Sequence, residues 1–193
     1  MARSREFDPD EAIEKAMSIF WKKGYSDTSV RDLVQATNVA HAGLYSAFKD
    51  KNGLFKEVLK HYDTSYGDML FGPMEQKGAG LPQIKGFFDF VLDAIKTNRF
   101  QNGCLMVNTS VEFGNATQEI LKQAQNNTER LEKALLNALS NAKNRQQVRG
   151  DLDIEKGSAL LITTFYGIAI LARSKIPYEM SENSVEQALN SLT

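Results

Sequence analysis

The stretch from Gly24 to Lys51 restricts the possible folds of this chain more than any other part of its sequence. Val30, Leu33 and Val34 have the spacing i, i+3, i+4 and therefore share one face of a helix. The Thr28-Ser29 pair before them supplies a hydroxyl that can cap the first free N–H groups of that helix. This pattern predicts a short helix that begins near residue 30.

A second short helix follows a break in the apolar pattern. Asn38 can adopt the left-handed backbone conformation that a sharp turn between two helices requires. Leu44, Tyr45 and Phe48 then supply a new apolar face that can pack against the first helix. Two helices joined in this way form a helix-turn-helix, whose second helix can lie in the major groove of DNA.

The composition favours an all-α fold around this motif. The chain has 193 residues, enough for one domain or two small ones, and 42% of them are hydrophobic while 24% are charged. Four prolines and thirteen glycines are few for a loop-rich β protein. Because no segment alternates like a strand, we expect roughly nine helices and no sheet.

The charge is distributed unevenly. The whole chain has a formal net charge of −1. Residues 22–60, however, include seven basic and four acidic residues, which gives this segment a local net charge of +3. A dimer doubles such a patch, which can then hold the phosphates of DNA. The alternative is an ordinary solvated surface of mixed charge.

The helix-turn-helix segment also carries an ordered set of residues without insertion. They are Gly24, Tyr25, Thr28, Ser29, Val30, Arg31, Asp32, Leu33, Val39, Leu44, Tyr45, Phe48, Lys51, Leu54 and Phe55. By these residues the segment resembles the tetracycline-repressor (TetR/AcrR) family of bacterial transcription regulators. Ala40, Ala42 and Ala47 replace the Ser, Gly and His that are usual there, and these departures concern base preference more than fold.

The resemblance implies an N-terminal three-helix DNA-binding head, residues 1–50, and a C-terminal helical bundle for ligand binding and dimerisation, residues 51–193. A helix over residues 51–66 would link the two. The expected partners are double-stranded DNA with a palindromic operator, a small-molecule inducer and a second copy of the chain. The expected function is that of a ligand-responsive repressor in the cytoplasm.

Nine residues of this segment are candidates for DNA contact because of their position. Tyr45 and Lys51 can reach phosphates, and His41 and Ala42 lie at the leading edge of the second helix, where they can meet base edges. Arg31 can reach a guanine from the first helix. The full set is Thr28, Ser29, Arg31, His41, Ala42, Gly43, Tyr45, Lys49 and Lys51. The alternative is a packing role for Tyr45 and an idle surface position for His41.

Other helix boundaries can be read from capping residues and breakers. Asp8-Pro9 should open the first helix and Gly24 should end it, while Arg3 and Arg5 belong to a short polar arm. The fourth helix should run from Lys51 to about Tyr66, before breakers at residues 71–73 and 78–82. The last helix is expected after Ser181.

Residues 158–172 are apolar nearly all round. A surface helix would have a polar face, so this helix should bury one side in its own core and the other against a second subunit. The alternative is a central helix buried in a monomer. The apolar run from residue 159 to 172 is too short for a bilayer, and no apolar leader is visible at the N-terminus, so no membrane partner is expected.

The resemblance further implies a ligand cavity in the C-terminal bundle. Candidate lining residues are Phe87, Phe88, Phe90, Val91, Cys104, Met106, Phe113, Phe165 and Tyr166. The alternative for such an aromatic and aliphatic set is plain core. No cofactor and no metal are expected, because neither His41 nor His61 has the spacing of a metal ligand set.

Cys104, the single cysteine, follows Gly103 at the start of a predicted helix. A helix N-terminus stabilises a thiolate, which would make this thiol reactive. The Gly103-Cys104-Leu105 segment resembles one in a subset of the family that includes electrophile-responsive regulators, so an electrophilic or redox inducer is one expectation. The alternative is a small buried hydrophobic residue.

An enzyme would need a catalytic constellation, and the sequence shows no nucleophile motif and no phosphate loop. We therefore expect no enzymatic activity. The rival hypothesis is a small-molecule-binding or catalytic helical bundle that does not bind DNA, and a helical scaffold for protein interaction is the third.

Overall fold

The computed structural model describes residues 7–113 and 118–193, and Arg3 and Arg5 lie outside this part of the chain. Within the described residues every regular element is a helix, which confirms the all-α prediction. The elements are α1 (Pro9–Lys23), α2 (Val30–Thr37), α3 (His41–Phe48), α4 (Lys51–Tyr62), the π-helical η1 (Asp63–Gly67), α5 (Asp68–Glu75), α6 (Leu81–Lys96), α7 (Leu105–Glu112), α8 (Gln118–Asn144), α9 (Ile154–Arg173) and α10 (Tyr178–Asn190).

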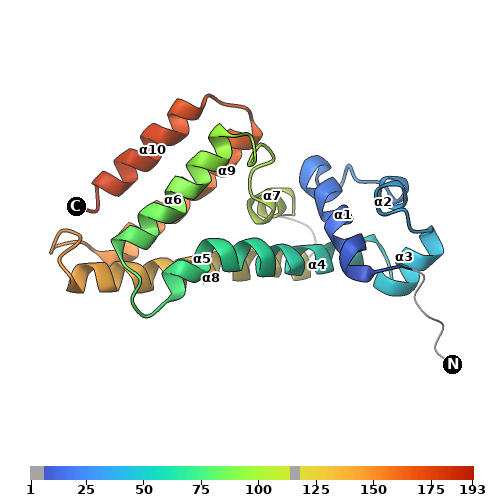
Figure 1. Cartoon of the computed structure of the whole chain (residues 1–193), viewed down its shortest axis with the longest axis horizontal. Helices are drawn as coiled ribbons and strands as arrows, with labels where there is room; N and C mark the ends of the chain where they lie inside the picture. Colours follow the sequence, from blue (N-terminus) through green and yellow to red (C-terminus); the bar gives the residue numbers. More distant parts are fainter. Residues whose placement is uncertain (1–6, 114–117) are drawn as a thin grey trace.

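The molecule is elongated, with α1–α3 at one end and α6 and α8–α10 at the other (Figure 1). We call α1–α3 the head and the helices from α4 onward the body. α4, η1 and α5 follow one another without a break and form one long helix that reaches from the head into the body. Counted in this way, the described residues form nine helices.

α1 has the boundaries that its capping residues predict. The Asp8 side chain accepts a hydrogen bond from the Asp10 N–H at 2.9 Å, and Pro9 occupies the first turn, where its missing N–H costs nothing. Gly24 ends the helix with a positive φ of 86°, a conformation that glycine adopts without strain. The buried face of α1 includes Met17 and Phe20 and packs against α4 and α2.

The prediction that residues 71–73 break the chain is wrong. α5 continues through Pro73 to Glu75, so the fourth helix does not end near Tyr66. Phe71 and Met74 are buried on this stretch, and α5 packs along α8. Tertiary packing therefore outweighs the loss of one backbone hydrogen bond at the proline.

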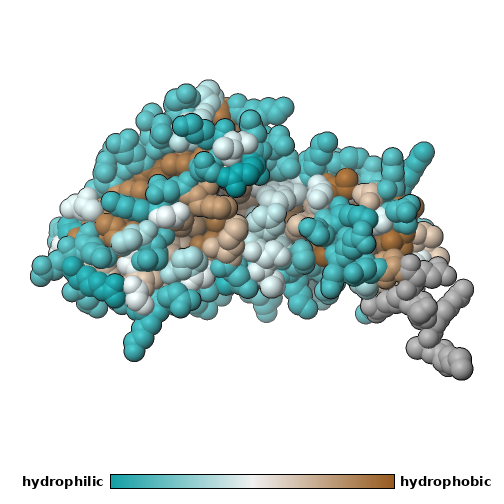
Figure 2. Space-filling view, in the orientation of Figure 1, coloured by the Kyte–Doolittle hydropathy of each residue, from teal (hydrophilic) through white to brown (hydrophobic). Residues whose placement is uncertain are grey.

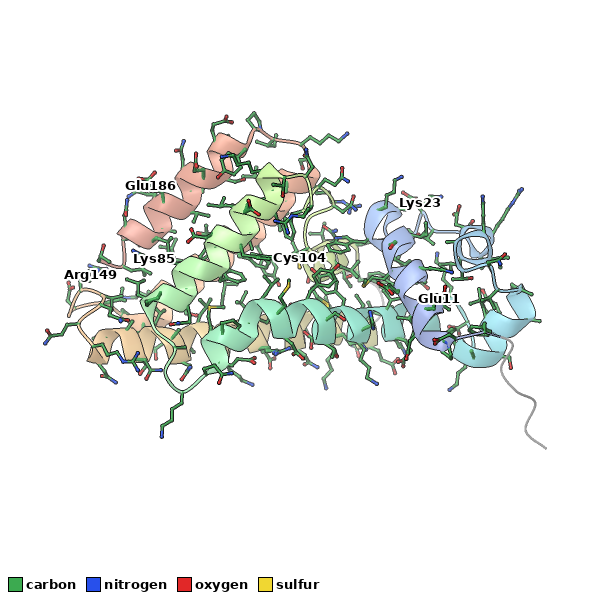
Figure 3. The ribbon with its side chains drawn as sticks, in the orientation of Figure 1. Glu11, Lys23, Lys85, Cys104, Arg149 and Glu186 are labelled. Atoms are coloured by element: carbon green, nitrogen blue, oxygen red, sulfur yellow. The ribbon has the colours of Figure 1, made fainter. Side chains whose placement is uncertain are left out.

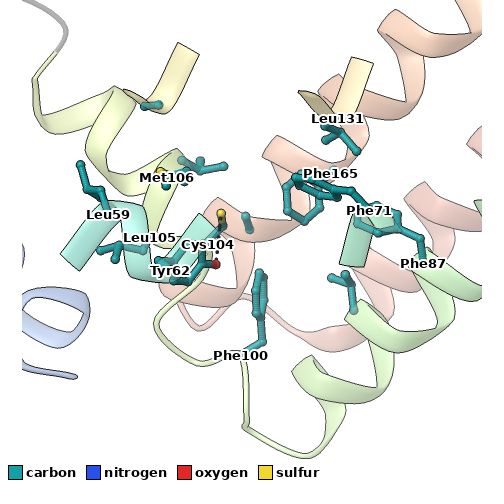
Figure 4. Packing of buried hydrophobic residues seen from close by; sticks show 14 of the residues in the cluster. Leu59, Tyr62, Phe71, Phe87, Phe100, Cys104, Leu105, Met106, Leu131 and Phe165 are labelled. Carbon is teal, nitrogen blue, oxygen red and sulfur yellow. Dashed lines mark hydrogen bonds between the residues drawn. The ribbon is translucent and has the colours of Figure 1, made fainter. Parts of the chain in front are cut away.

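The body surrounds a core of aromatic and aliphatic side chains. Phe87 of α6 lies 5.2 Å from Phe165 of α9 and 6.1 Å from Phe71 of α5, measured between ring centroids (Figure 4). α8 supplies Leu131 and further buried residues along its length. Polar residues cover much of the visible surface, while apolar residues show between α6 and α10 and in smaller patches on the head (Figure 2).

Two expectations about the last helices need correction. α10 begins at Tyr178 and not after Ser181, because Pro177 precedes its first turn and Ser181 is buried inside it. α9 spans 20 residues and is long and apolar enough to cross a bilayer, so the length argument was wrong. In this fold α9 instead packs against α8 and α10, and buries Leu161 and Phe165.

Candidate nucleic-acid interface

Local hydrogen bonds hold the helix-turn-helix, and among them is the hydroxyl cap that the sequence predicts for α2. The Ser29 Oγ accepts from the Asp32 N–H at 3.1 Å, and the Asp32 carboxylate accepts from the Ser29 N–H at 2.9 Å. These two bonds form a capping box at the start of α2. Asn38 has a φ of 58° and its N–H donates to the Val34 carbonyl at 3.0 Å, so it makes the left-handed turn that was expected.

α3 presents one side to the head core and the other to solvent. Leu44 and Phe48 are buried, whereas His41 and Ala42 are exposed at its N-terminal end and Gly43 is half-buried. The His41 and Tyr45 rings lie 4.2 Å apart on the outer side of the helix. The exposed first turn of α3 therefore has the shape and polarity to enter a DNA groove.

The other predicted contact residues divide into accessible and inaccessible ones. Arg31 and Lys49 are exposed, and so is Ser29, although its hydroxyl also bonds Asp32. Thr28 has no exposed surface and its hydroxyl donates to the Gly24 carbonyl at 2.6 Å, so its predicted contact with phosphate is wrong. It instead holds the turn between α1 and α2.

Lys51, at the start of α4, is only half exposed. Its ammonium lies 4.2 Å from the centroid of the Tyr25 ring, an arrangement that stabilises the cation. Burial lowers the pKa of this lysine, with nearby Glu112 acting in the opposite direction. The ammonium therefore lies between the head surface and the junction with the body.

The predicted ligand residues do not gather around one site. Phe87, Phe88, Val91, Met106 and Phe165 are buried, and Tyr166 is half-buried with its hydroxyl against Thr128. Phe113 is separate, because its ring packs 5.0 Å from Tyr25 and 5.8 Å from Phe55 at the junction of head and body. Phe90 is 38% exposed on the outer side of α6, which contradicts an inward-facing role.

Cys104 lies at the N-cap of α7, in the interior between α4 and the rest of the body (Figure 3). Its side chain is buried, and the Tyr62 hydroxyl donates to its Sγ at 3.5 Å. Burial raises the pKa of the thiol, and hydrogen bonds from Tyr62 and from backbone N–H groups counteract this only in part. The expectation of a stabilised thiolate is therefore wrong for this conformation.

Two polar side chains of the body, which the sequence did not single out, hold the end of α1. Both carboxylate oxygens of Glu112 accept backbone N–H groups, from Tyr25 at 2.9 Å and from Ser26 at 2.6 Å. The Arg173 guanidinium donates to the Trp21 carbonyl at 3.0 Å. These contacts join residues that are 86 to 152 positions apart, so no local pattern could have revealed them.

A capped helix-turn-helix with an exposed second helix, joined by a long helix to an all-helical body, defines the class of helix-turn-helix regulators. Two family models match the sequence, one over the helix-turn-helix and one over the body. Residues 12–58 match "Bacterial regulatory proteins, tetR family", and residues 80–185 match "Tetracyclin repressor-like, C-terminal domain". The second match alone covers more than half of the chain.

Individual relatives agree with these matches. The chain is 27% identical over 173 residues to the HTH-type transcriptional repressor ComR of Escherichia coli, covering 89% of this chain and 82% of ComR. It is also 23% identical to YezE, an uncharacterized HTH-type transcriptional regulator of Bacillus subtilis, and this match covers all of both chains. A cysteine-substituted variant of the TetR family regulator CifR, solved with a 26-bp operator DNA, shares the fold with a TM-score of 0.85 at 24% identity, over the whole of both chains.

The chain therefore belongs to the TetR family of bacterial transcription regulators, whose function is to bind DNA. This confirms the resemblance that the helix-turn-helix residues indicated. It also sets aside the rival hypothesis of a helical bundle that does not bind DNA.

Proposed function

We propose that this protein is a homodimeric repressor that binds a palindromic operator and releases it when a small molecule enters the body. The observation that carries the proposal is the exposed N-terminal edge of α3, held at a fixed angle by the capping box of α2 and the left-handed turn at Asn38. ComR is named a repressor and CifR was solved with operator DNA, which supports the same role here.

In this proposal α3 enters the major groove. His41 and Ala42 would meet base edges, with Gly43 allowing close approach, while Tyr45, Ser29 and Lys49 would bind phosphates. Arg31 would reach the groove edge from α2. Lys51 would bind a phosphate while its ammonium remains on the Tyr25 ring.

We propose the boundary between DNA-binding and ligand-binding domains near residue 50. α1–α3 bury Phe20, Leu33 and Leu44 together, but they also need Leu54 and Phe55 of α4 to complete their core. α4 therefore belongs to both parts, as a linking helix should. Through it a change in the body can alter the position of the head.

The inducer in this proposal binds the body near Phe87, Phe165 and Tyr166, where the Tyr166 hydroxyl and Thr128 offer a polar pair beside aromatic rings. Aromatic walls with one polar pair suit a small, mostly apolar molecule. The resemblance of residues 103–105 to an electrophile-responsive subset remains a prediction, and the buried Cys104 of this conformation does not favour it. The proposal includes no catalytic role and places the protein in the cytoplasm.

The first experiment is selection of bound fragments from a genomic library by the purified protein, followed by a screen for compounds that release the selected fragment.

Tyr45→Ala should weaken binding to all selected fragments alike, by about fivefold for one lost hydrogen bond. His41→Ala should instead change the base preference at one position of each half-site. Fluorescence anisotropy with single-base-pair variants separates the two effects. If both variants bind like the parent, the assigned contacts are wrong.

A further inference from the structure

The C-terminal end of α1 and the turn after it are held by the body through directional contacts. Glu112, the last residue of α7, accepts the backbone N–H groups of Tyr25 and Ser26 at 2.9 and 2.6 Å. Arg173, the last residue of α9, donates to the Trp21 carbonyl at 3.0 Å. The C-terminal residues of α7 and α9 thus both bind one short segment of the head, residues 21–26.

The approach of Glu112 depends on the glycine that ends α1. A Cβ atom placed on Gly24 would lie 3.0 Å from the Glu112 Oε2, closer than such contacts normally are. Burial acts to raise the pKa of Glu112, but the hydrogen bonds from the turn and the nearby Arg173 charge outweigh it, so the pKa is lowered. The contact is therefore made by a charged carboxylate at neutral pH, which strengthens both hydrogen bonds.

Arg173 connects the head to the loop before α7 as well. The same guanidinium nitrogen that binds the Trp21 carbonyl also donates to the Asn102 carbonyl at 3.3 Å. The Trp21 indole N–H in turn donates to the Gly103 carbonyl at 2.8 Å. The end of α1, the 102–103 loop and the end of α9 thus form one connected set of hydrogen bonds.

The remaining contacts at this junction are mostly apolar. The Tyr25 ring packs against Phe55 and Phe113 at 5.0 Å from each, and Trp21 packs edge-on against Tyr62 and Tyr66. Aromatic packing stabilises the junction and favours edge-on or offset rings, but over a broad range of ring distances, so it tolerates small rotations of the head. Hydrogen bonds need defined distances and angles, and can select one orientation among these.

We propose that Glu112 and Arg173 are positioning residues for operator binding, which fix the angle of the head on the body and so restrict the dimer to one spacing of half-sites. This inference rests on the proposed function, because spacing has meaning only for two heads on one palindrome. It also gives α7 a regulatory role. A ligand that displaces α7 in the body would withdraw Glu112 from the head.

The contact itself can be tested without DNA. Hydrogen–deuterium exchange of the parent should show protected amides at Tyr25 and Ser26, and Glu112→Ala should remove that protection. The control is Glu132→Ala, which removes an exposed carboxylate of α8 that makes no ion pair among the described residues. Equal protection in the parent and Glu112→Ala would refute the contact and the inference with it.

The consequence is tested with synthetic operators in which the selected half-sites are separated by zero to four inserted base pairs. The parent should prefer one spacing, and Glu112→Ala and Arg173→Ala should each reduce that preference by about tenfold, as expected for loss of charge-assisted hydrogen bonds. Glu112→Gln keeps one acceptor oxygen and should retain part of the preference. A merely destabilised protein would lose active fraction equally at every spacing.

The outcomes separate this inference from the proposed function. If the parent binds no operator at any spacing, the proposed function fails, whereas the exchange experiment still decides whether the head is held. If the parent selects one spacing and the folded Glu112 and Arg173 variants keep the same preference, the proposed function stands and the positioning role is overturned. Circular dichroism establishes that each variant is folded. If Glu112→Ala does not fold, Glu112→Gln takes its place in the spacing experiment.

Discussion

Cys104 shows how burial and a helix dipole compete at one residue. The N-cap position of α7 places the thiol near free backbone N–H groups, which favour a thiolate. The surrounding core excludes water, and this desolvation is the larger effect, so the pKa rises above its ordinary value of 9.0. Tyr62, also buried, provides the hydrogen bond but cannot replace the lost hydration.

We therefore expect slow alkylation of Cys104 by iodoacetamide in the folded protein. Since the thiolate is the reactive form and the folded pKa is raised, the rate should still be rising at pH 9, where a free cysteine is half ionised. The unfolded thiol ionises at lower pH than the folded one, so the stability contribution of this group declines as the pH rises above its unfolded pKa. Mass spectrometry of the labelled protein, with urea-unfolded protein as control, measures the rates. A fast reaction with an inflection below pH 8 would contradict the structure.

At the scale of single elements, α2 depends on its capping box. Ser29→Ala should lower the free energy of unfolding by about 1 kcal/mol, the usual cost of losing an N-cap oxygen. Ser46→Ala, a serine exposed in the middle of α3, is the control and should cost little or nothing. Thermal unfolding measures both. An equal effect of the two substitutions would mean that the cap contributes no specific stability.

The Asp32 carboxylate of this capping box also makes a pH-dependent contribution to the stability of the fold. The Lys23 ammonium and Ser29 bond the Asp32 carboxylate and hold its pKa well below the ordinary 3.8. A group whose folded pKa is lowered stabilises the fold fully above its unfolded pKa and loses that effect as the pH falls. The contribution of Asp32 should therefore be constant above pH 5 and decline below 3.8. Urea unfolding of Asp32→Asn and the parent across this range measures the difference.

A second element-scale prediction concerns the π-helical segment η1. Arg130 of α8 binds Glu75 at 2.6 Å and Asp68 at 2.8 Å, at the two ends of α5, and lies 3.8 Å from Asp63 in η1. The planar guanidinium presents five donors in a fixed fork that binds carboxylates bidentately, a geometry that the compact lysine ammonium does not reproduce. Arg130→Lys should therefore increase hydrogen exchange in residues 63–75 and lower the unfolding free energy by about 1 kcal/mol. Lys133→Arg on the same helix is the control.

The elements also show what the sequence alone could determine. Local signals placed α1 and α2 correctly, because Asp8, Ser29 and Gly24 act on the residues beside them. Local reasoning failed at Pro73, where packing against α8 continues the helix. It also failed at Thr28, whose hydroxyl turns inward to a carbonyl. The Glu112 contact joins residues far apart in sequence, and only the assembled fold reveals such a pair.

At the scale of the whole molecule, one side of α9 and α10 remains apolar and exposed. Leu160 and Ile170 on α9 are 42% and 45% exposed, and Met180 on α10 is 53% exposed. Between these two helices lies a shallow groove of about 770 Å³, lined in part by Leu160, Pro177 and Met180. The small residues Ala159 and Gly167 are exposed on the same helix and allow close approach of another helix. The sequence predicted that α9 would bury one side in its own core and offer the other to a second subunit, and this exposed side is compatible with that prediction.

We expect Leu160→Glu combined with Ile170→Glu to produce a monomer, because two carboxylates in an apolar interface would each lose hydration without gaining a partner. Analytical ultracentrifugation of the parent and the variant measures this directly. Met69→Glu, at a methionine 47% exposed on α5, adds a carboxylate at similar exposure and should leave the dimer intact. The monomer should also bind a full operator no more tightly than a single half-site, since it carries one head. A variant that remains dimeric would place the subunit contact on another face of the body.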